Sequence, residues 1–198
     1  MAGVSTRAVS SRAASWGADA PVGEEQARER LLAAAEACYA ERGPGRTRMS
    51  DIASRAGVHR RTVYDYFPSK DALLAASFVR AISGVLDATE YCWHTDEPFL
   101  DRLVNAVVVG LEAARNSPTM ALLIGADQLG RTFRAAEASE AWGENLAGAL
   151  GHRLEEAMAH WVTRIAFSLA AEPSRAEDGG DAGLLRAFLP ACLAPRQS

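Results

Sequence analysis

The chain has 198 residues, of which 48% are hydrophobic and 23% charged, a composition typical of a soluble globular protein with one full-sized core or with a small domain attached to a larger one. No apolar run approaches the roughly 20 residues that cross a bilayer, and the N-terminus lacks the apolar region of a secretory signal. We therefore expect a cytoplasmic protein with no membrane partner.

The cysteines and histidines indicate neither a disulfide framework nor a metal site. Cys38, Cys92 and Cys192 lie far apart among apolar neighbours, so we expect them to be small core residues. The histidines offer no i, i+4 pair of metal ligands, because His152 and His160 are two helical turns apart. We expect no metal and no cofactor.

The net charge is −4, but the charges are unevenly distributed. Residues 42 to 70 hold seven basic and two acidic side chains, whereas residues 76 to 198 hold ten basic and sixteen acidic ones. A compact basic block beside an acidic remainder is typical of a DNA-binding head on a larger body. A solvated charged face would produce the same pattern, so charge alone leaves both interpretations open.

The N-terminal third predicts a loose arm followed by short helices. Residues 1–23, rich in Ala, Ser and Gly, predict a flexible arm in which Trp16 is the one large apolar residue. A helix from Glu24 has one apolar face and ends at Gly43-Pro44. Short helices follow at about 49–56 and 60–66, and Ser69 is placed to cap a long helix that begins at Lys70.

The rest of the chain also has helical periodicity. Apolar stripes predict helices around 100–111, 120–129 and 146–169, then an acidic, Gly-rich loop over 173–183 and a last helix at 184–193. No convincing alternating run is present. The sequence predicts an all-α protein of about nine or ten helices.

Residues 49–67 have the pattern of a helix-turn-helix. Ile52, Ala53, Val58, Val63 and Phe67 form its predicted interior, and Gly57 stands where the chain must turn. The predicted exposed residues of the second helix are His59, Arg60, Arg61, Thr62, Tyr64 and Tyr66. Cations and hydroxyls on a short helix suit the major groove, although an αα-hairpin with a charged face is the structural alternative.

This segment resembles the TetR-like (tetracycline-repressor-like) regulators. The resemblance lies in Ile52-Ala53, Ala56-Gly57-Val58, Thr62-Val63-Tyr64, Tyr66-Phe67, Lys70 and Leu73, with Ala34 to Gly43 similar to the family's first helix. It implies an N-terminal three-helix DNA-binding domain at 24–70, after the arm at 1–23, and a C-terminal helical ligand-binding and dimerisation domain at 71–198.

The resemblance also implies roles for individual residues. Tyr64, Tyr66 and Lys70 match positions that contact the sugar-phosphate backbone, and Arg60, Arg61 and Thr62 match positions that reach bases or nearby phosphates. The full predicted DNA-binding set is Arg48, His59, Arg60, Arg61, Thr62, Tyr64, Tyr66 and Lys70. His59 departs from the family, which usually has a Ser or Thr cap there, so its role stays open.

Two further sets are predicted in the larger domain. The effector-binding candidates are Tyr91, Trp93, Gln128 and Trp142, although aromatic residues at helical spacing are also typical of a plain core. The dimer-interface candidates are Leu150, Leu154, Met158, Trp161, Ile165 and Leu169. An intramolecular core helix would show the same stripe.

The sequence thus predicts a ligand-responsive repressor that binds a palindromic DNA operator as a homodimer and is released by a small-molecule effector. One alternative is a small-molecule-binding protein of the same fold without specific DNA recognition. The other is a helical enzyme, which the absence of G-x-S-x-G, Walker A and H-E-x-x-H motifs disfavours.

Overall fold

The computed structural model describes Trp16, residues 21–125, residues 129–138, Trp142, Leu154 and residues 156–193, and the regular elements in these parts are all helical. The α-helices are α2 (Glu24–Arg42), α3 (Met49–Ala56), α4 (Arg60–Tyr66), α5 (Lys70–Thr89), α6 (Phe99–Asn116), α7 (Pro118–Ile124), α8 (Leu129–Glu137), α10 (Glu156–Ala171) and α11 (Gly180–Leu193). Two 3₁₀ helices, η2 (Glu90–His94) and η4 (Ala176–Asp178), join them. The predicted all-α class is confirmed, with nine α-helices in the described part of the chain.

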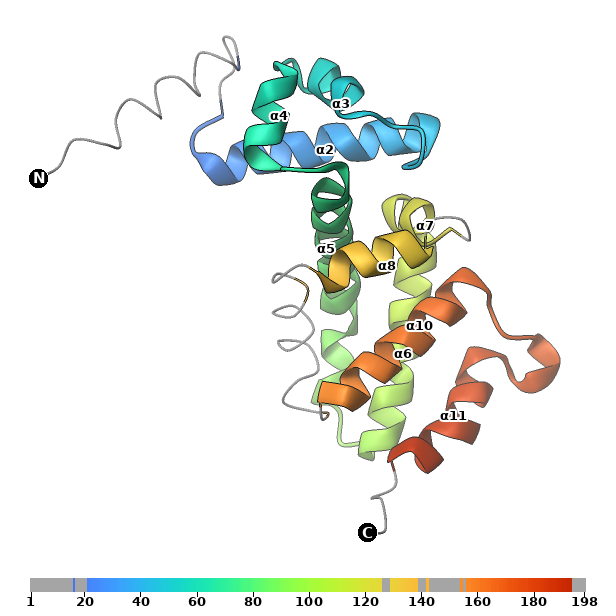
Figure 1. The fold of residues 1–198 in the computed structure, drawn as a ribbon. Helices are drawn as coiled ribbons and strands as arrows, with labels where there is room; N and C mark the ends of the chain where they lie inside the picture. The colour runs from blue at the N-terminus through green and yellow to red at the C-terminus, as the bar shows by residue number, and fades with distance from the viewer. Residues whose placement is uncertain are drawn as a thin grey trace, which may run out of the picture.

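The helices form a small head and a larger body connected by α5 (Figure 1). In the head, α2 packs against α3, and α3 against α4. From the head α5 runs into the body, where it contacts α6, α7 and α8, while α6 also contacts α10 and α11. The Ser69 hydroxyl accepts a hydrogen bond from Ala72 N at 3.0 Å, so the predicted cap of α5 is confirmed.

Three predicted boundaries differ from the structure. The helix expected at 146–169 begins at Glu156 as α10 and Leu154 lies in a bend before it, while residues 146–153 and 155 lie outside the described residues. The helix expected at 120–129 begins earlier, at Pro118, because Ser117 caps α7 through Met120 N and Pro118 occupies the first turn. It ends at Ile124, and a second helix, α8, begins at Leu129. The loop expected over 173–183 is shorter, since α11 begins at Gly180. Gly179 and Gly180 both have positive φ, at 78° and 66°, which lets η4 turn directly into α11.

One helical stretch, Lys70–His94, is long and apolar enough by composition alone to span a bilayer. The search for an uninterrupted apolar run in the sequence missed this stretch, because charged residues such as Arg80 and Asp87 interrupt it. Half of its most apolar window is buried inside the protein, where α5 packs against the helices of the body. A core helix of a soluble protein has this same composition, so the stretch is weak evidence for a membrane span.

A partly buried ion pair joins α11 to α6 and α10. Arg115 on α6 donates to Leu169 O at 2.6 Å and to Asp181 Oδ2 at 2.7 Å. The backbone N and hydroxyl of Ser174 donate to Asp181 Oδ1 at 2.9 and 2.5 Å. Burial alone would raise the pKa of Asp181, but the hydrogen bonds from Ser174 and Arg115 outweigh it and hold that pKa below its usual value.

We predict that Asp181→Asn lowers the free energy of unfolding by about 1–2 kcal/mol at neutral pH, because it removes charged hydrogen bonds. A carboxyl whose pKa is depressed in the folded state stabilises the fold above its unfolded pKa of about 3.9, and this contribution is lost as the pH falls through the folded value. Urea denaturation at pH 7, 5, 4 and 3 should show the difference shrinking towards acid. Asp96→Asn, at an exposed position, is the control. A difference that stays constant with pH would contradict this account.

Candidate functional site

The turn between α3 and α4 has the geometry that the sequence predicted. Gly57 ends α3 in the left-handed conformation, with φ 71° and ψ 34°. Val58 N donates to Ala53 O at 3.0 Å and Gly57 N to Ser54 O at 3.3 Å, the two bonds of a Schellman motif. Ile52, Ala53, Val63 and Phe67 are buried and Val58 packs against the core, so the predicted interior is confirmed.

Two arginines of α2 hold the C-terminal ends of the other head helices. Arg30 Nη2 donates to Ala56 O, the last carbonyl of α3, at 3.1 Å. Arg28 Nη1 donates to Tyr66 O, the last carbonyl of α4, at 3.2 Å. Cations suit these positions because helix carbonyls at a C-terminus lack intrahelical partners and carry partial negative charge. Sequence analysis gave neither arginine a role, since no local spacing links α2 to those carbonyls.

Trp16 packs against α2 and α4 of the head. Its side chain is only 4% exposed, packs edge-on against Tyr66 with ring centroids 6.2 Å apart, and lies under the Arg30 guanidinium at 5.3 Å. Trp16 is therefore an ordered part of the head, although the sequence placed it in a flexible arm.

The exposed face of α4 is narrower than predicted. Arg60, Arg61 and Tyr64 are exposed, whereas Thr62 and Tyr66 are buried, so the prediction that the latter two side chains face solvent is wrong. The reason is the helical period: residues 62 and 66 are one turn apart and share the inward face with Val63 and Phe67. The outward face contains positions 60, 61, 64 and 65, the last of which is an aspartate.

The basic block divides into paired and unpaired cations. Arg42 pairs with Asp51 at 3.4 Å, and Arg55 pairs with Glu41. By contrast, Arg48, Arg60 and Arg61 are exposed and form no ion pair within the described part of the chain. These three guanidinium groups, of Arg60 and Arg61 on α4 and of Arg48 at the start of α3, are available for an anionic partner.

Tyr64 orients one of these arginines. Arg60 Nη2 donates to Tyr64 Oη at 3.0 Å, and its guanidinium lies 5.2 Å from the centroid of the same ring. This i, i+4 pair restricts the rotamers of both side chains before any partner arrives.

The Lys70 ammonium, at the start of α5, already has a hydrogen-bond partner. Its ammonium donates to Gly45 O at 2.9 Å, which ties the start of α5 to the loop between α2 and α3. Burial lowers the pKa of Lys70 from its ordinary value. The lysine thus holds the loop between α2 and α3 against the start of α5.

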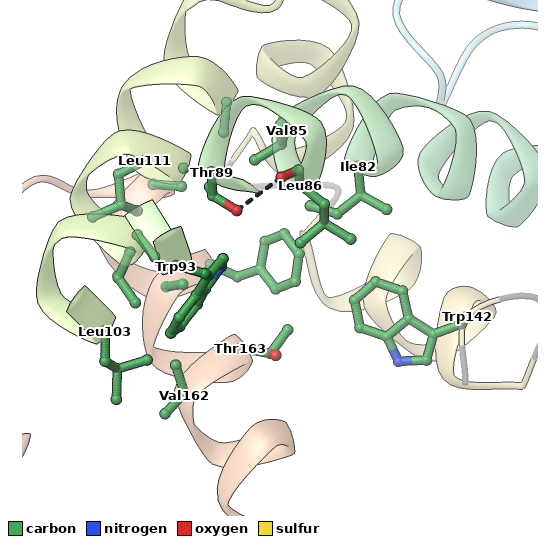
Figure 2. A pocket seen from close by; sticks show the side chains of 17 residues that line it. Ile82, Val85, Leu86, Thr89, Trp93, Leu103, Leu111, Trp142, Val162 and Thr163 are labelled. Carbon is green, nitrogen blue, oxygen red and sulfur yellow. Dashed lines mark hydrogen bonds between the residues drawn. The ribbon is translucent and has the colours of Figure 1, made fainter. Parts of the chain in front are cut away.

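A cavity of about 100 Å³ lies in the body, far along α5 from the head. Figure 2 shows its walls: Ile82, Val85, Leu86 and Thr89 of α5, with Leu103 and Leu111 of α6 and Val162 and Thr163 of α10. Trp93 of η2 and Trp142 also line it. Two of the four predicted effector-binding residues therefore meet at one cavity.

The other two predicted effector residues are not placed there. Tyr91 is 63% exposed and does not line the cavity, because on η2 it points away from the wall that Trp93 forms. Gln128 lies outside the described residues. Most of the residues that line the cavity could not be predicted from the sequence. Val, Leu and Ala at helical spacing are found both around a cavity and in a filled core.

Phe167 and Trp142 connect the cavity to its surroundings. Phe167 lines the cavity and packs against Phe78 of α5 at 5.2 Å and Phe133 of α8 at 5.6 Å between ring centroids. Trp142 contacts the same two rings at 5.5 and 6.0 Å. Phe167 and Trp142 therefore line the cavity and also pack against side chains of α5 and α8.

The predicted dimer stripe is only partly available to a partner. Leu154 and Leu169 are buried within their own chain, whereas Met158, Trp161 and Ile165 are half-buried against the core. Leu150 lies outside the described residues.

The cysteine prediction is correct for two of three residues. Cys38 and Cys92 are buried, but Cys192 is exposed on α11, where the helix turns it towards solvent. Among the described residues, no group of three or more His, Cys, Asp or Glu side chains is arranged to hold a metal ion.

Comparison with known proteins identifies the family to which the chain belongs. The profile of the bacterial regulatory proteins of the tetR family matches residues 31–77, which cover most of the head and the start of α5. An HTH-type transcriptional regulator of Mycobacterium tuberculosis, Rv1255c, is 32% identical over 162 residues, which are 77% of this chain and 79% of that relative. The chain belongs to the TetR family of transcriptional regulators.

Solved structures of two bacterial transcriptional regulators share the fold. The putative transcriptional regulator SCO7518 from Streptomyces coelicolor A3(2) has a TM-score of 0.59 and 23% identity, over 85% of this chain and 99% of that one. A TetR transcriptional regulator from Rhodococcus sp. RHA1 also has a TM-score of 0.59, with 20% identity over 88% of this chain and 100% of that one.

His59 is an unusual cap for a TetR recognition helix. It occupies the N-cap of α4 in an extended conformation, with φ −72° and ψ 147°, but its side chain makes no capping hydrogen bond. Only its backbone carbonyl serves the first turn, accepting from Thr62 N at 2.9 Å. The imidazole is exposed and leaves the first-turn amides of α4 without a side-chain acceptor.

We predict that His59→Ser stabilises the protein by about 0.5–1 kcal/mol, because a serine hydroxyl at this extended position accepts from the first-turn amides. His59→Ala supplies no acceptor and is the control, with an expected change near zero. Thermal and urea unfolding measure both. Equal stabilities of the two variants would contradict the capping account. If His59 touches DNA, both variants also lose operator affinity, which separates the two roles.

Proposed function

We propose that this TetR-family protein is a ligand-responsive repressor that binds a palindromic operator as a homodimer and is released by a small molecule. The observation that carries this proposal is the continuity of α5. Its first turn is bonded to the head, and its last turns form one wall of the cavity. A regulator needs this connection and an enzyme does not. Family membership also supports a cytoplasmic location.

We propose that the chain is divided as the sequence suggests, into an arm at 1–23, a DNA-binding domain at 24–70 and a ligand-binding and dimerisation domain at 71–198. Met158, Trp161 and Ile165, half-buried on α10, are the remaining candidates for the dimer contact. A symmetric dimer would set its heads in successive major grooves, about 34 Å apart.

The α4 face supports direct reading of DNA. Arg60 and Arg61 are exposed and unpaired by any carboxylate of the described residues, and each can make a bidentate pair with guanine O6 and N7. Arg48, Tyr64 and Lys70 flank them and suit phosphate contacts. Thr62 and Tyr66 can take part only through their edges or after moving, because their side chains are buried.

The clamp between α2 and α5 supports transmission of ligand binding to the head. Arg80 of α5 bonds Glu29 Oε2 and Glu36 Oε2 of α2, each at 2.6 Å. Arg131 of α8 bonds Asp71 at the start of α5, also at 2.6 Å, but the two members of this pair are more exposed than those of the Arg80 contacts. A 100-fold loss of operator affinity requires only about 2.7 kcal/mol of coupling, which a small tilt of α5 relative to its partner can supply.

We predict that Arg60→Ala and Arg61→Ala each weaken operator binding by roughly 1–3 kcal/mol and relax the base preference at the contacted position. The operator is first obtained by selecting bound fragments from the host genome. Fluorescence anisotropy in 0.15 M salt, against random DNA of equal length, measures the effect.

Arg175→Ala removes an exposed arginine near η4 and is the matched control, expected to leave binding unchanged. If Arg60→Ala and Arg61→Ala kept both affinity and sequence preference, a ligand-binding protein without specific DNA recognition would be favoured. Wild-type protein that bound the selected operator no more tightly than random DNA would overturn the proposed function itself.

We predict that Arg80→Gln weakens binding to the full palindrome by more than it weakens binding to an isolated half-site, because the clamp fixes the angle between head and body. Arg131→Gln is the matched control, since an exposed ion pair contributes only about 0.2–1 kcal/mol. Anisotropy titrations with palindromic and half-site duplexes give the two ratios. Equal losses on both duplexes would mean that Arg80 merely stabilises the head.

A further inference from the structure

We propose that the effector is an uncharged, predominantly apolar small molecule that enters between α5, α6 and α10 and is recognised by shape. This inference rests on the proposed function, in which the cavity takes the effector. It goes beyond that function by naming the chemical class of the ligand.

The described part of the wall offers no counter-charge to a charged group, and its one unpartnered donor is the indole N–H of Trp142. Every described residue that lines the cavity is apolar except Thr89 and Thr163 and the indoles of Trp93 and Trp142, and none of them is ionisable. An ion transferred from water into such a wall loses its hydration without gaining a counter-charge. A carboxylate or ammonium inside the cavity is therefore strongly disfavoured.

The two threonine hydroxyls restrict the ligand further. Thr89 Oγ1 donates to Leu86 O at 2.8 Å, the bond drawn in Figure 2, and Thr163 Oγ1 donates to Ala159 O at 2.7 Å. Both protons are therefore used within their own helices, and each oxygen keeps only acceptor capacity. A ligand hydroxyl can donate to them, whereas a ligand carboxylate finds no threonine donor.

The dimensions of the cavity favour an elongated molecule. Its wall on α6 extends from Leu103 to Ala114, roughly 16 Å of helix at 1.5 Å per residue. The free volume of about 100 Å³ is small for such a length. Apolar cavities of roughly 150 Å³ hold a single benzene ring, so a longer molecule must push the three helices apart. Because α5 carries the head, that expansion is the event that reaches the DNA-binding face.

Gly110 provides a position at which the cavity can be filled. A Cβ placed on Gly110 would lie 3.4 Å from Thr89 Cγ2 and 3.6 Å from Val85 Cγ1, both on the cavity wall of α5. Gly84 on α5 is exposed, and a Cβ there meets nothing within 4 Å. Gly110→Leu therefore occupies the space between α5 and α6, and Gly84→Leu is a matched control outside it.

The test compares neutral and charged probes that have the same apolar group. Decan-1-ol, decanoate and decyltrimethylammonium are titrated into the full-length protein below their micellar concentrations, with 2-naphthol and 2-naphthoate as a second neutral and charged pair. Fluorescence of Trp93 and Trp142, which line the cavity, and calorimetry report binding. We expect decan-1-ol to bind at least about 10-fold more tightly than either charged decyl compound, and 2-naphthol more tightly than 2-naphthoate.

The variants locate the binding. Gly110→Leu should weaken decan-1-ol binding by at least about 10-fold, and Gly84→Leu should leave it unchanged. If circular dichroism shows that Gly110→Leu does not fold, Gly110→Ala replaces it, since a methyl group there is in ordinary van der Waals contact with the wall. Tighter binding of a charged probe, no binding of either neutral probe, or binding that ignores the Gly110 variants would overturn the proposal.

Operator release is measured separately, so the two proposals fail differently. If decan-1-ol fills the cavity but leaves the operator complex intact at saturation, the ligand class stands and ligand-responsive repression fails. If a charged probe binds and releases the operator, repression stands and the ligand class fails.

Discussion

The arrangement depends on α5 being one uninterrupted helix from Lys70 to Thr89. Its first turn is capped by Ser69 and tied to the head by Lys70, its middle carries Arg80, and its last turns line the cavity. A helix transmits displacement along its axis because each turn is hydrogen-bonded to the next. In the proposed dimer, the spacing of the two heads and the volume of the cavity would therefore both depend on α5.

The contacts of the head's arginines separate two that hold the fold together from two that are exposed and unpaired within the described residues. Arg28 and Arg30 are committed to the carbonyls that end α4 and α3, and Trp16 and Phe67 stack beneath them. Arg60 and Arg61 face outward from a helix whose inner side is closed by Thr62 and Tyr66. The bonds of Arg28 and Arg30 fix the ends of α4 and α3, and this rigidity holds Arg60 and Arg61 in a defined arrangement on the exposed side of α4.

The head could be predicted from the sequence because its signals are local. Gly57 in the left-handed conformation, the Ser69 cap and the buried Ile52 and Val63 all follow from turn chemistry and helical period. Thr62 and Tyr66 were misplaced because a helix of two turns can rotate about its axis by a fraction of a turn without changing its apolar pattern. Tertiary packing against α2 and Trp16 fixes that rotation.

The body could be predicted only as a set of helices. Trp93 and Trp142 were found because large aromatic side chains are conspicuous, but the apolar walls of α5, α6 and α10 read the same whether they enclose space or fill it. The contacts of Arg80 with Glu29 and Glu36 and of Arg115 with Asp181 join residues far apart in the chain, and no periodicity encodes them.

The most direct test of the central claim is the distance between the two heads of the dimer. A spin label at Ala40→Cys, exposed on α2, in a Cys192→Ser background allows this distance to be measured by double electron–electron resonance. The account predicts one narrow distribution on operator DNA, and a shifted or broadened one when decan-1-ol fills the cavity, with no such change in Gly110→Leu. Release of the operator with an unchanged distance distribution would contradict it.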